Sequence, residues 1–178
     1  MDNVGVRYAS ALYSLAKDDE EIIQYQSAMK SLYIAIMENK EILAFLSSSF
    51  IAKKEKYEIT SLLCSSFNLR HLCPFFKVLI DNHRVNDFAS IYRNFNSMSN
   101  DYQNIEEGLI YSTIPLHESK IREIESALEK QSKKQVELVN KIDESLIGGI
   151  KIIIHDRVYD ASIKNKINSL KSELIENR

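Results

Sequence analysis

The chain has 178 residues, of which 44% are hydrophobic and 27% are charged, and this is the composition of a globular protein with one or two domains. A formal net charge of −2 argues against nucleic-acid binding by charge alone. No segment approaches the ~18 consecutive apolar residues that a membrane-spanning helix requires. The first residues resemble neither a signal peptide nor an Arg-rich transit peptide.

Residues 1–104 show the periodicity of amphipathic helices throughout. Apolar side chains recur three and four positions apart, so that each stretch carries them on one helical face. These stripes run over residues 8–15, 22–36, 42–46, 59–67, 72–80 and 85–102, with short polar breaks between them. Six helices with short connections predict an N-terminal six-helix bundle.

From Gly108 onwards the period changes. Residues 109–114 are β-branched and aromatic, which favours a strand, and residues 116–131 carry the stripe of a helix. Apolar and polar residues alternate over residues 135–142, as in a half-buried strand. The apolar run over residues 150–154 predicts a third strand.

The end of the chain predicts one more helix, for which Asp160 is a suitable N-cap. Its apolar stripe consists of residues three and four positions apart: Ile163, Ile167, Leu170 and Leu174. The expected fold is therefore mainly α. It consists of the six-helix bundle over residues 1–104, followed by a small C-terminal α/β module over residues 105–178.

The motifs that carry chemistry elsewhere are missing or weak in this sequence. The pair Gly148-Gly149 lacks the Gly-Lys-Ser/Thr of a phosphate-binding loop and the Gly-x-x-Gly of a KH nucleic-acid domain. We expect the pair to form a structural turn that lets two segments approach closely. The four histidines show no zinc-helix spacing, and no Gly-x-Ser-x-Gly elbow exists. Cys64 and Cys73 form no recognised spacing, so neither a disulfide nor a metal site with His71 is expected.

Six motifs follow one another along nearly the whole chain. They are Arg7-Tyr8-Ala9-Ser10-Ala11-Leu12, Phe45-Leu46 and residues 76–84, 111–116, 143–150 and 156–163. In this order they resemble the delta (OSCP) subunit family of F-type ATP synthases. The Leu-Ile-Gly-Gly segment at a fixed distance from Asp-x-Ser is moderately specific, and the full set is strong. The sequence departs from the family where Ser47 replaces a frequent proline, and where His83 and Ala161 replace glycines.

The resemblance implies a stator subunit that performs no chemistry and holds no cofactor. The N-terminal bundle would bind the N-terminal helix of an alpha subunit. The C-terminal module would bind the C-terminal end of the peripheral-stalk b subunit, with one copy in each complex. Such a subunit keeps the catalytic head from turning with the rotor, so that proton-driven rotation is converted into ATP. Its membrane attachment would be indirect, at the cytoplasmic face of a bacterial inner membrane.

In the family, the alpha-subunit helix lies in an apolar groove between the first and fifth helices. The matching candidates in this chain are Tyr8, Ala11, Leu12, Leu15, Phe76, Leu79 and Ile80. A partner helix requires anchors at such helical spacings. Core is the ordinary fate of a helical apolar stripe, however, so a core position remains the alternative for each candidate.

The second module carries weaker signals. Leu170, Leu174 and Ile175 of the last helix are the candidates for a stalk contact that the resemblance supports. A different class of binder also stays open: a free-standing helical adaptor, or an RNA-associated α/β module with a helical extension. The negative net charge argues against the RNA-associated module.

Overall fold

The computed structural model describes residues 3–176, and side chains are described for residues 4–172. The chain packs as two units, Met1–Ser99 and Asn100–Arg178. The sequence places the boundary after residue 104, whereas the contacts place it inside the last helix of the first half. The last turn of that helix therefore groups with the second unit.

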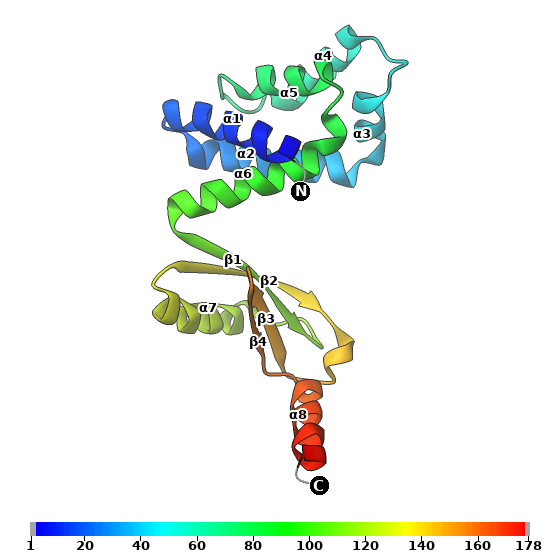
Figure 1. Ribbon diagram of the computed structural model, residues 1–178. Helices are drawn as coiled ribbons and strands as arrows, with labels where there is room; N and C mark the ends of the chain where they lie inside the picture. The colour runs from blue at the N-terminus through cyan, green and yellow to red at the C-terminus, as the bar shows by residue number, and fades with distance from the viewer. Residues whose placement is uncertain (1–2, 177–178) are drawn as a thin grey trace. The chain divides into compact units, whose positions relative to one another are not determined.

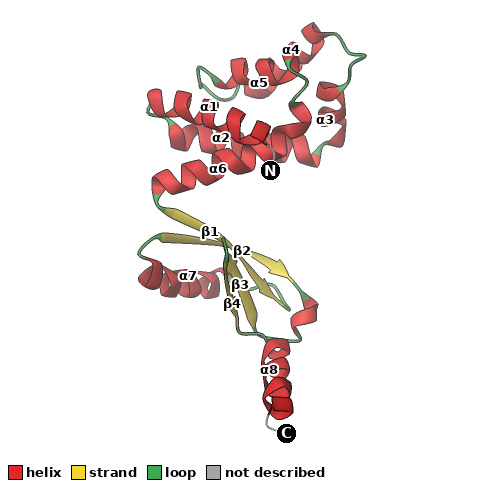
Figure 2. Ribbon diagram, viewed as in Figure 1, coloured by secondary structure: helices red, strands yellow, loops and turns green. Residues whose placement is uncertain are grey.

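The described part of the chain is mainly helical, with a small four-stranded sheet in the second unit (Figures 1 and 2). The helices of the first half are α1 (Asn3–Asp18), α2 (Ile22–Glu38), α3 (Lys40–Ser47), α4 (Lys53–Cys64), α5 (Leu72–Asp81) and α6 (Phe88–Gln103), with a 3-10 turn η1 (Val85–Asp87) before α6. Each follows one of the apolar stripes of the sequence. Burial of one face of each helix forms a single core.

Contacts between aromatic rings show which helices of the first unit lie next to α1. Tyr8 of α1 meets Phe75 of α5 edge to face, with ring centroids 6.4 Å apart. Tyr13, on another side of α1, meets Phe95 of α6 at the same centroid distance. Edge-to-face pairs of this kind add to the apolar burial. Helix α1 therefore contacts α5 along one flank and α6 along the other.

The turn before η1 contains a residue in the left-handed region of backbone space. His83 adopts a φ of 55°. This left-handed region strains most side chains, although histidine enters it more readily than β-branched residues do. The backbone N–H of Arg84 donates to the carbonyl of Leu79 at 2.8 Å, which closes the end of α5 over this turn.

The second unit is built around a mixed sheet. Its elements are β1 (Ile105–Ser112), α7 (Glu118–Ser132), β2 (Gln135–Ile142), the 3-10 turn η2 (Glu144–Leu146), β3 (Ile150–Ile154), β4 (Arg157–Asp160) and α8 (Ile163–Glu176). The strand order is β2-β1-β3-β4. Strands β1 and β2 are parallel and are joined through α7, as a crossover requires, whereas β3 and β4 continue the sheet in antiparallel fashion.

Three features of the second unit differ from the expectation. Strand β1 begins at Ile105 rather than residue 109, and the short strand β4 was not predicted. The N-cap of α8 is Ser162, whose hydroxyl accepts from the N–H of Asn165 at 3.1 Å, and not Asp160. Asp160 instead accepts from the N–H of Ser162 at 3.0 Å, one step before the helix.

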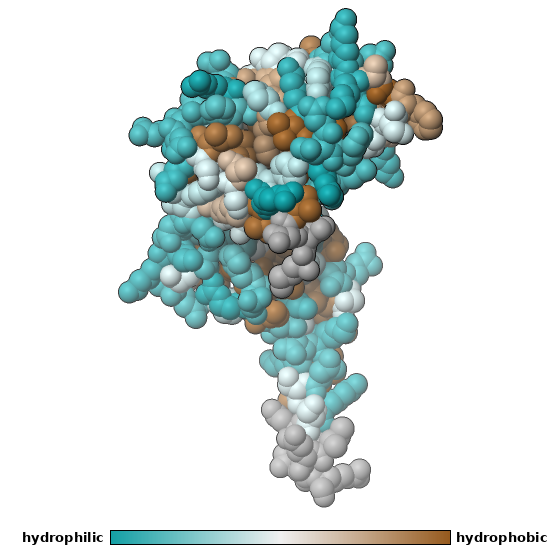
Figure 3. All heavy atoms as spheres, turned by 45° about the horizontal axis from the view of Figure 1, so that its top comes forward, coloured by the Kyte–Doolittle hydropathy of each residue, from teal (hydrophilic) through white to brown (hydrophobic). Residues whose placement is uncertain are grey.

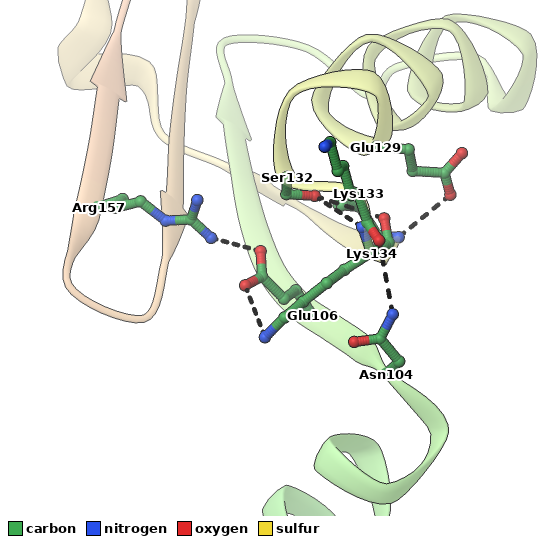
Figure 4. A network of polar contacts seen from close by, with 8 residues as sticks. Asn104, Glu106, Glu129, Ser132, Lys133, Lys134 and Arg157 are labelled. Carbon is green, nitrogen blue, oxygen red and sulfur yellow. Dashed lines mark hydrogen bonds and ion pairs between the residues drawn. The ribbon is translucent and has the colours of Figure 1, made fainter.

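Glu106 explains the early start of β1. Its side chain is 9% exposed and forms an ion pair with Lys134 at 3.3 Å and a charge-assisted hydrogen bond with Arg157 (Figure 4). A buried carboxylate must be paired. These two cations therefore allow a charged residue to occupy a buried strand position, where the sequence alone predicts a polar residue outside the strand.

The glycine pair forms the turn that joins η2 to β3. Gly149 has a φ of 78°, and a Cβ atom there would lie 2.4 Å from the carbonyl oxygen of Ala161. The N–H of Ile163 donates to the carbonyl of Gly148 at 3.0 Å. Absence of side chains at the pair thus lets the start of α8 approach this turn closely.

Candidate binding site between helices α1 and α5

Four of the seven candidate groove residues are core residues in the structure. Leu12 on α1 and Phe76, Leu79 and Ile80 on α5 are each at most 3% exposed. They belong to the cluster that fills the centre of the first unit. A partner helix could contact them only if the unit opened, so the alternative of a core position holds for these four.

The other three candidates remain accessible on α1. Tyr8 and Leu15 are half-buried, and Ala11 is exposed. They lie three or four positions apart, on one flank of the helix. The opposite flank faces α6, since the Ser10 hydroxyl donates to the sulfur of Met98 at 3.9 Å and Tyr13 contacts Phe95. Tyr8, Ala11 and Leu15 therefore lie on the flank of α1 that adjoins α5.

The accessible flank of α5 is identified by elimination. The residues of α5 that face α4 are spaced four positions apart and have polar, sulfur or cation–π partners there: Cys73 with Ser61, Lys77 with Tyr57, and Asp81 with Lys53. Phe75 contacts Tyr8 of α1 from the other side of the helix. Val78, one turn further along that side, is 45% exposed, and Pro74 is exposed as well.

These residues are the accessible apolar positions on the flanks of α1 and α5 next to the Tyr8–Phe75 contact. We define the α1–α5 strip by its accessible members: Tyr8, Ala11, Leu15, Pro74 and Val78. On the face of the first unit that Figure 3 shows, apolar residues gather among hydrophilic ones. Sequence reasoning missed Val78 and Pro74, because Val78 stands between the bulky pairs of α5 that dominate the apolar stripe.

A polar cluster ties the end of α1 to the start of α5. The Tyr25 hydroxyl, from α2, donates to Asp19 Oδ2 at 3.0 Å and accepts from the backbone N–H of His71 at 3.0 Å. Asp19 Oδ1 lies 3.7 Å from His71 Nε2. Burial raises the pKa of Tyr25 to about 12, and the Asp19 carboxylate adds to this shift. The neutral hydroxyl therefore holds the two helix ends together at ordinary pH.

The described residues contain no cluster of three or more His, Cys, Asp or Glu side chains that could hold a metal ion. Cys64 and Cys73 are free thiols. Burial raises the pKa of Cys64 to about 12, so this thiol stays protonated and is a poor nucleophile. Within residues 3–176, no helix has both the length and the apolar character that a membrane crossing needs.

The chain thus consists of a helical unit with accessible apolar side chains on α1 and α5, followed by a small α/β unit. The family model for the ATP synthase delta (OSCP) subunit matches residues 4–174, and the chain belongs to this family. Delta subunits are structural parts of the ATP synthase and are peripheral components of that membrane complex. The chain is accordingly a non-catalytic stator subunit and not an enzyme.

Relatives match the chain over nearly its whole length. The ATP synthase subunit delta of Natranaerobius thermophilus is 33% identical over 94% of this chain and 93% of its own. The subunit delta of Lactobacillus johnsonii is 31% identical over 99% and 97%. Among solved structures, a chain of the Toxoplasma gondii mitochondrial ATP synthase hexamer matches with a TM-score of 0.75 and 20% identity over 98% of each chain. This last likeness is one of fold.

Proposed function

We propose that this stator subunit joins the catalytic head of a bacterial F-type ATP synthase to its peripheral stalk. The helices of residues 1–104 act as one six-helix bundle that holds the N-terminal helix of an alpha subunit. Residues 105–178 bind the C-terminal end of the b subunit. One copy serves each complex, at the cytoplasmic face of the inner membrane.

The α1–α5 strip is the observation that supports the alpha-subunit contact. An amphipathic helix docks into a groove through apolar anchors three and four positions apart. Tyr8, Ala11 and Leu15 offer this spacing on one wall, and Val78 offers an apolar side chain on the other. The small side chain of Ala11 leaves room for a partner backbone, and Tyr8 combines a contact ring with a polar rim group.

The burial of each candidate decides which substitution can test the alpha-subunit contact. Leu79 is fully buried, so Leu79→Asp would place a charge in the core and report on folding instead of binding. Val78→Asp alters the accessible wall at a position that is already 45% exposed. Leu62→Asp is a matched control, because Leu62 is an apolar residue of α4 that is 70% exposed.

The experiment titrates the full chain and both variants against a fluorescently labelled peptide of the alpha-subunit N-terminal helix from the same organism. We expect Val78→Asp to weaken binding by about tenfold or more, which corresponds to ~1.4 kcal/mol. Leu62→Asp should bind as the unaltered chain does. Equal binding by all three proteins would contradict the α1–α5 strip as the docking surface, and no binding by the unaltered chain would contradict the alpha-subunit contact.

The proposed stalk contact of the second unit includes α8. Ile163, Ile167 and Leu170 are exposed at 39% or more and form one stripe of this helix. An unpaired apolar stripe of this kind is suited to a partner helix. The candidates Leu174 and Ile175 lie outside the residues whose side chains are described.

A further inference from the structure

The sheet of the second unit has one filled face. Helix α7 covers it, and the apolar side chains between them form one core: Ile110, Leu128, Val136, Leu138, Ile152 and Ile154. Because side chains alternate across a strand, the residues between these positions point to the opposite face of the sheet. Figure 2 shows α7 alongside the sheet, while α8 leads away from its end.

The opposite face carries a continuous apolar row that crosses all four strands. Leu109 of β1 is in register with Val139 of β2 on one side and with Ile153 of β3 on the other. Ile153 is in turn in register with Val158 of β4. Val139 is 59% exposed and Val158 is 56% exposed, and the two central residues are half-buried. We call these four residues the cross-strand row.

Charges of opposite sign flank the cross-strand row. Two positions before it along β1 and β2, Glu107 is in register with Glu137. Two positions beyond it, Tyr111 is in register with Lys141 of β2 and with Lys151 of β3, and Asp160 ends this line on β4. The row therefore has an acidic border on one side and, over β2 and β3, a basic border on the other.

The dimensions of the row fit a helix. Neighbouring strands lie ~4.8 Å apart, so a row of four residues is ~14 Å long. This length equals about two and a half turns of an α-helix. A helix lying along the row places its apolar stripe on the four side chains. Its two polar flanks then meet the two charged borders.

We propose that the cross-strand row is the docking surface for an amphipathic helix of the peripheral stalk. The bound helix carries basic residues along the flank that meets Glu107 and Glu137, and acidic residues along the flank that meets Lys141 and Lys151. Charges in this arrangement fix the direction of the helix as well as its position. The inference rests on the proposed function, since it assigns the surface through which the second unit contacts the b subunit.

The helix α8 of the same chain is a poorer occupant than a stalk helix. Two backbone hydrogen bonds fix its start, from Ala161 N–H to the carbonyl of Ile150 at 2.9 Å and from Ile163 N–H to that of Gly148 at 3.0 Å. Over its described side chains, residues 163–172, its only charged groups are three lysines. These would complement the acidic border but repel the basic one.

The test uses the full chain and the purified water-soluble part of the b subunit from the same organism, with binding measured by calorimetry. Val139→Asp and Val158→Asp each place a charge in the row at an exposed position. Ile114→Asp is the matched control, because Ile114 is 67% exposed and lies beyond the end of β1. Circular dichroism and thermal melts verify that each variant is folded.

We expect each row variant to weaken b-subunit binding by about tenfold or more, ~1.4 kcal/mol, while Ile114→Asp leaves it unchanged. Glu137→Lys and Lys141→Glu should each weaken binding by several-fold, with a greater loss at low salt than at high salt. Equal binding by the unaltered chain and both row variants overturns the docking surface but leaves the stalk role intact. No binding by the unaltered chain contradicts the stalk role itself.

Two further outcomes identify other occupants and overturn the proposal. If the free chain is a dimer by sedimentation and Val139→Asp makes it monomeric, a second copy covers the row. If deletion of residues 163–178 speeds hydrogen exchange of β2 and β4 in the free chain, α8 covers it.

Discussion

Glu106 on β1 binds the guanidinium of Arg157 on β4, although β3 lies between these two strands in the sheet. The other carboxylate oxygen of Glu106 lies 3.3 Å from Nζ of Lys134, which precedes β2 (Figure 4). One carboxylate on β1 thus connects this strand to the start of one edge strand, β2, and to the other edge strand, β4. Removal of its charge should loosen the second unit as a whole.

Glu106→Gln should lower the free energy of unfolding of the second unit by about 1.5–3 kcal/mol at pH 7, the range for hydrogen bonds to charged groups. The amide keeps the shape of the side chain but loses both ion pairs. Urea denaturation followed by circular dichroism measures the change. Glu137→Gln, an equal change at an exposed position of β2, should have little effect, and a similar loss in both variants would contradict this role for Glu106.

The stability difference between the unaltered chain and Glu106→Gln should depend on pH. Burial raises the pKa of Glu106, but the hydrogen bonds and charges of Arg157 and Lys134 outweigh it, so the pKa of this carboxyl is lowered overall. Its contribution is therefore fully present above the ordinary glutamate value of about 4.3 and is lost as the pH falls through the lowered pKa. Urea denaturation of the unaltered chain and of Glu106→Gln between neutral pH and pH 3 measures this. The difference in their free energies of unfolding should disappear only at the acidic end of the range.

Gly149→Ala should destabilise the second unit more than Gly148→Ala. At Gly149 the φ is 78°, and the new Cβ would lie 2.4 Å from the backbone oxygen of Ala161. Left-handed backbone costs an L-residue about 1–2 kcal/mol before any clash is counted. At Gly148 the nearest atom is Cδ1 of Ile163, the mobile end of an exposed side chain. Thermal melts should rank the two variants in this order, and the reverse order would contradict the close approach of backbone at Gly149.

Leu79→Asp should unfold the first unit or destabilise it by at least about 3 kcal/mol, because it removes a buried side chain and buries a charge. Val78→Asp, at the adjacent and 45% exposed position, should change stability much less. Circular dichroism at rising temperature distinguishes the two. If Leu79→Asp kept the stability of the unaltered chain, Leu79 would not be a core residue in solution.

Tyr25→Phe should destabilise the first unit by about 1–2 kcal/mol, since it leaves the His71 N–H and the Asp19 carboxylate without their shared partner. The pKa of Tyr25 is raised by burial to about 12. Its neutral hydroxyl therefore contributes below the unfolded-state value of about 10, and this contribution disappears as the pH rises towards 12. The stability gap between the two proteins should accordingly narrow above pH 10, which alkaline denaturation curves can measure.

The elements that bury one face against a neighbour were predicted well from the sequence. The limits of β2 and β3 are the predicted ones, 135–142 and 150–154. The strand β4 was missed because it has only four residues and Arg157 and Asp160 are both exposed. The early start of β1 depends on Glu106, whose partners Lys134 and Arg157 are distant in sequence, so no local pattern could indicate it.

The sequence supplied candidate residues for the site but not which of them are accessible. An apolar stripe identifies the helix face that packs against other elements. It does not show which residues of that face are buried in the core and which remain accessible at its edge. Leu12 and Leu15 belong to the same stripe, yet the first is fully buried and the second is half-buried. The division depends on where α1 and α5 touch, and the Tyr8–Phe75 contact decides this.

The position of β1 within the sheet affects how the second unit responds to force. Strand β1 is the first strand of this unit and follows the last turn of α6. It is hydrogen-bonded on both sides, to β2 along all eight of its residues and to β3 along five. A pull along the strand therefore loads these bonds together in shear, instead of peeling them apart one after another. For a subunit that resists rotor torque, the strand that receives the tension is thus the one that is hardest to extract.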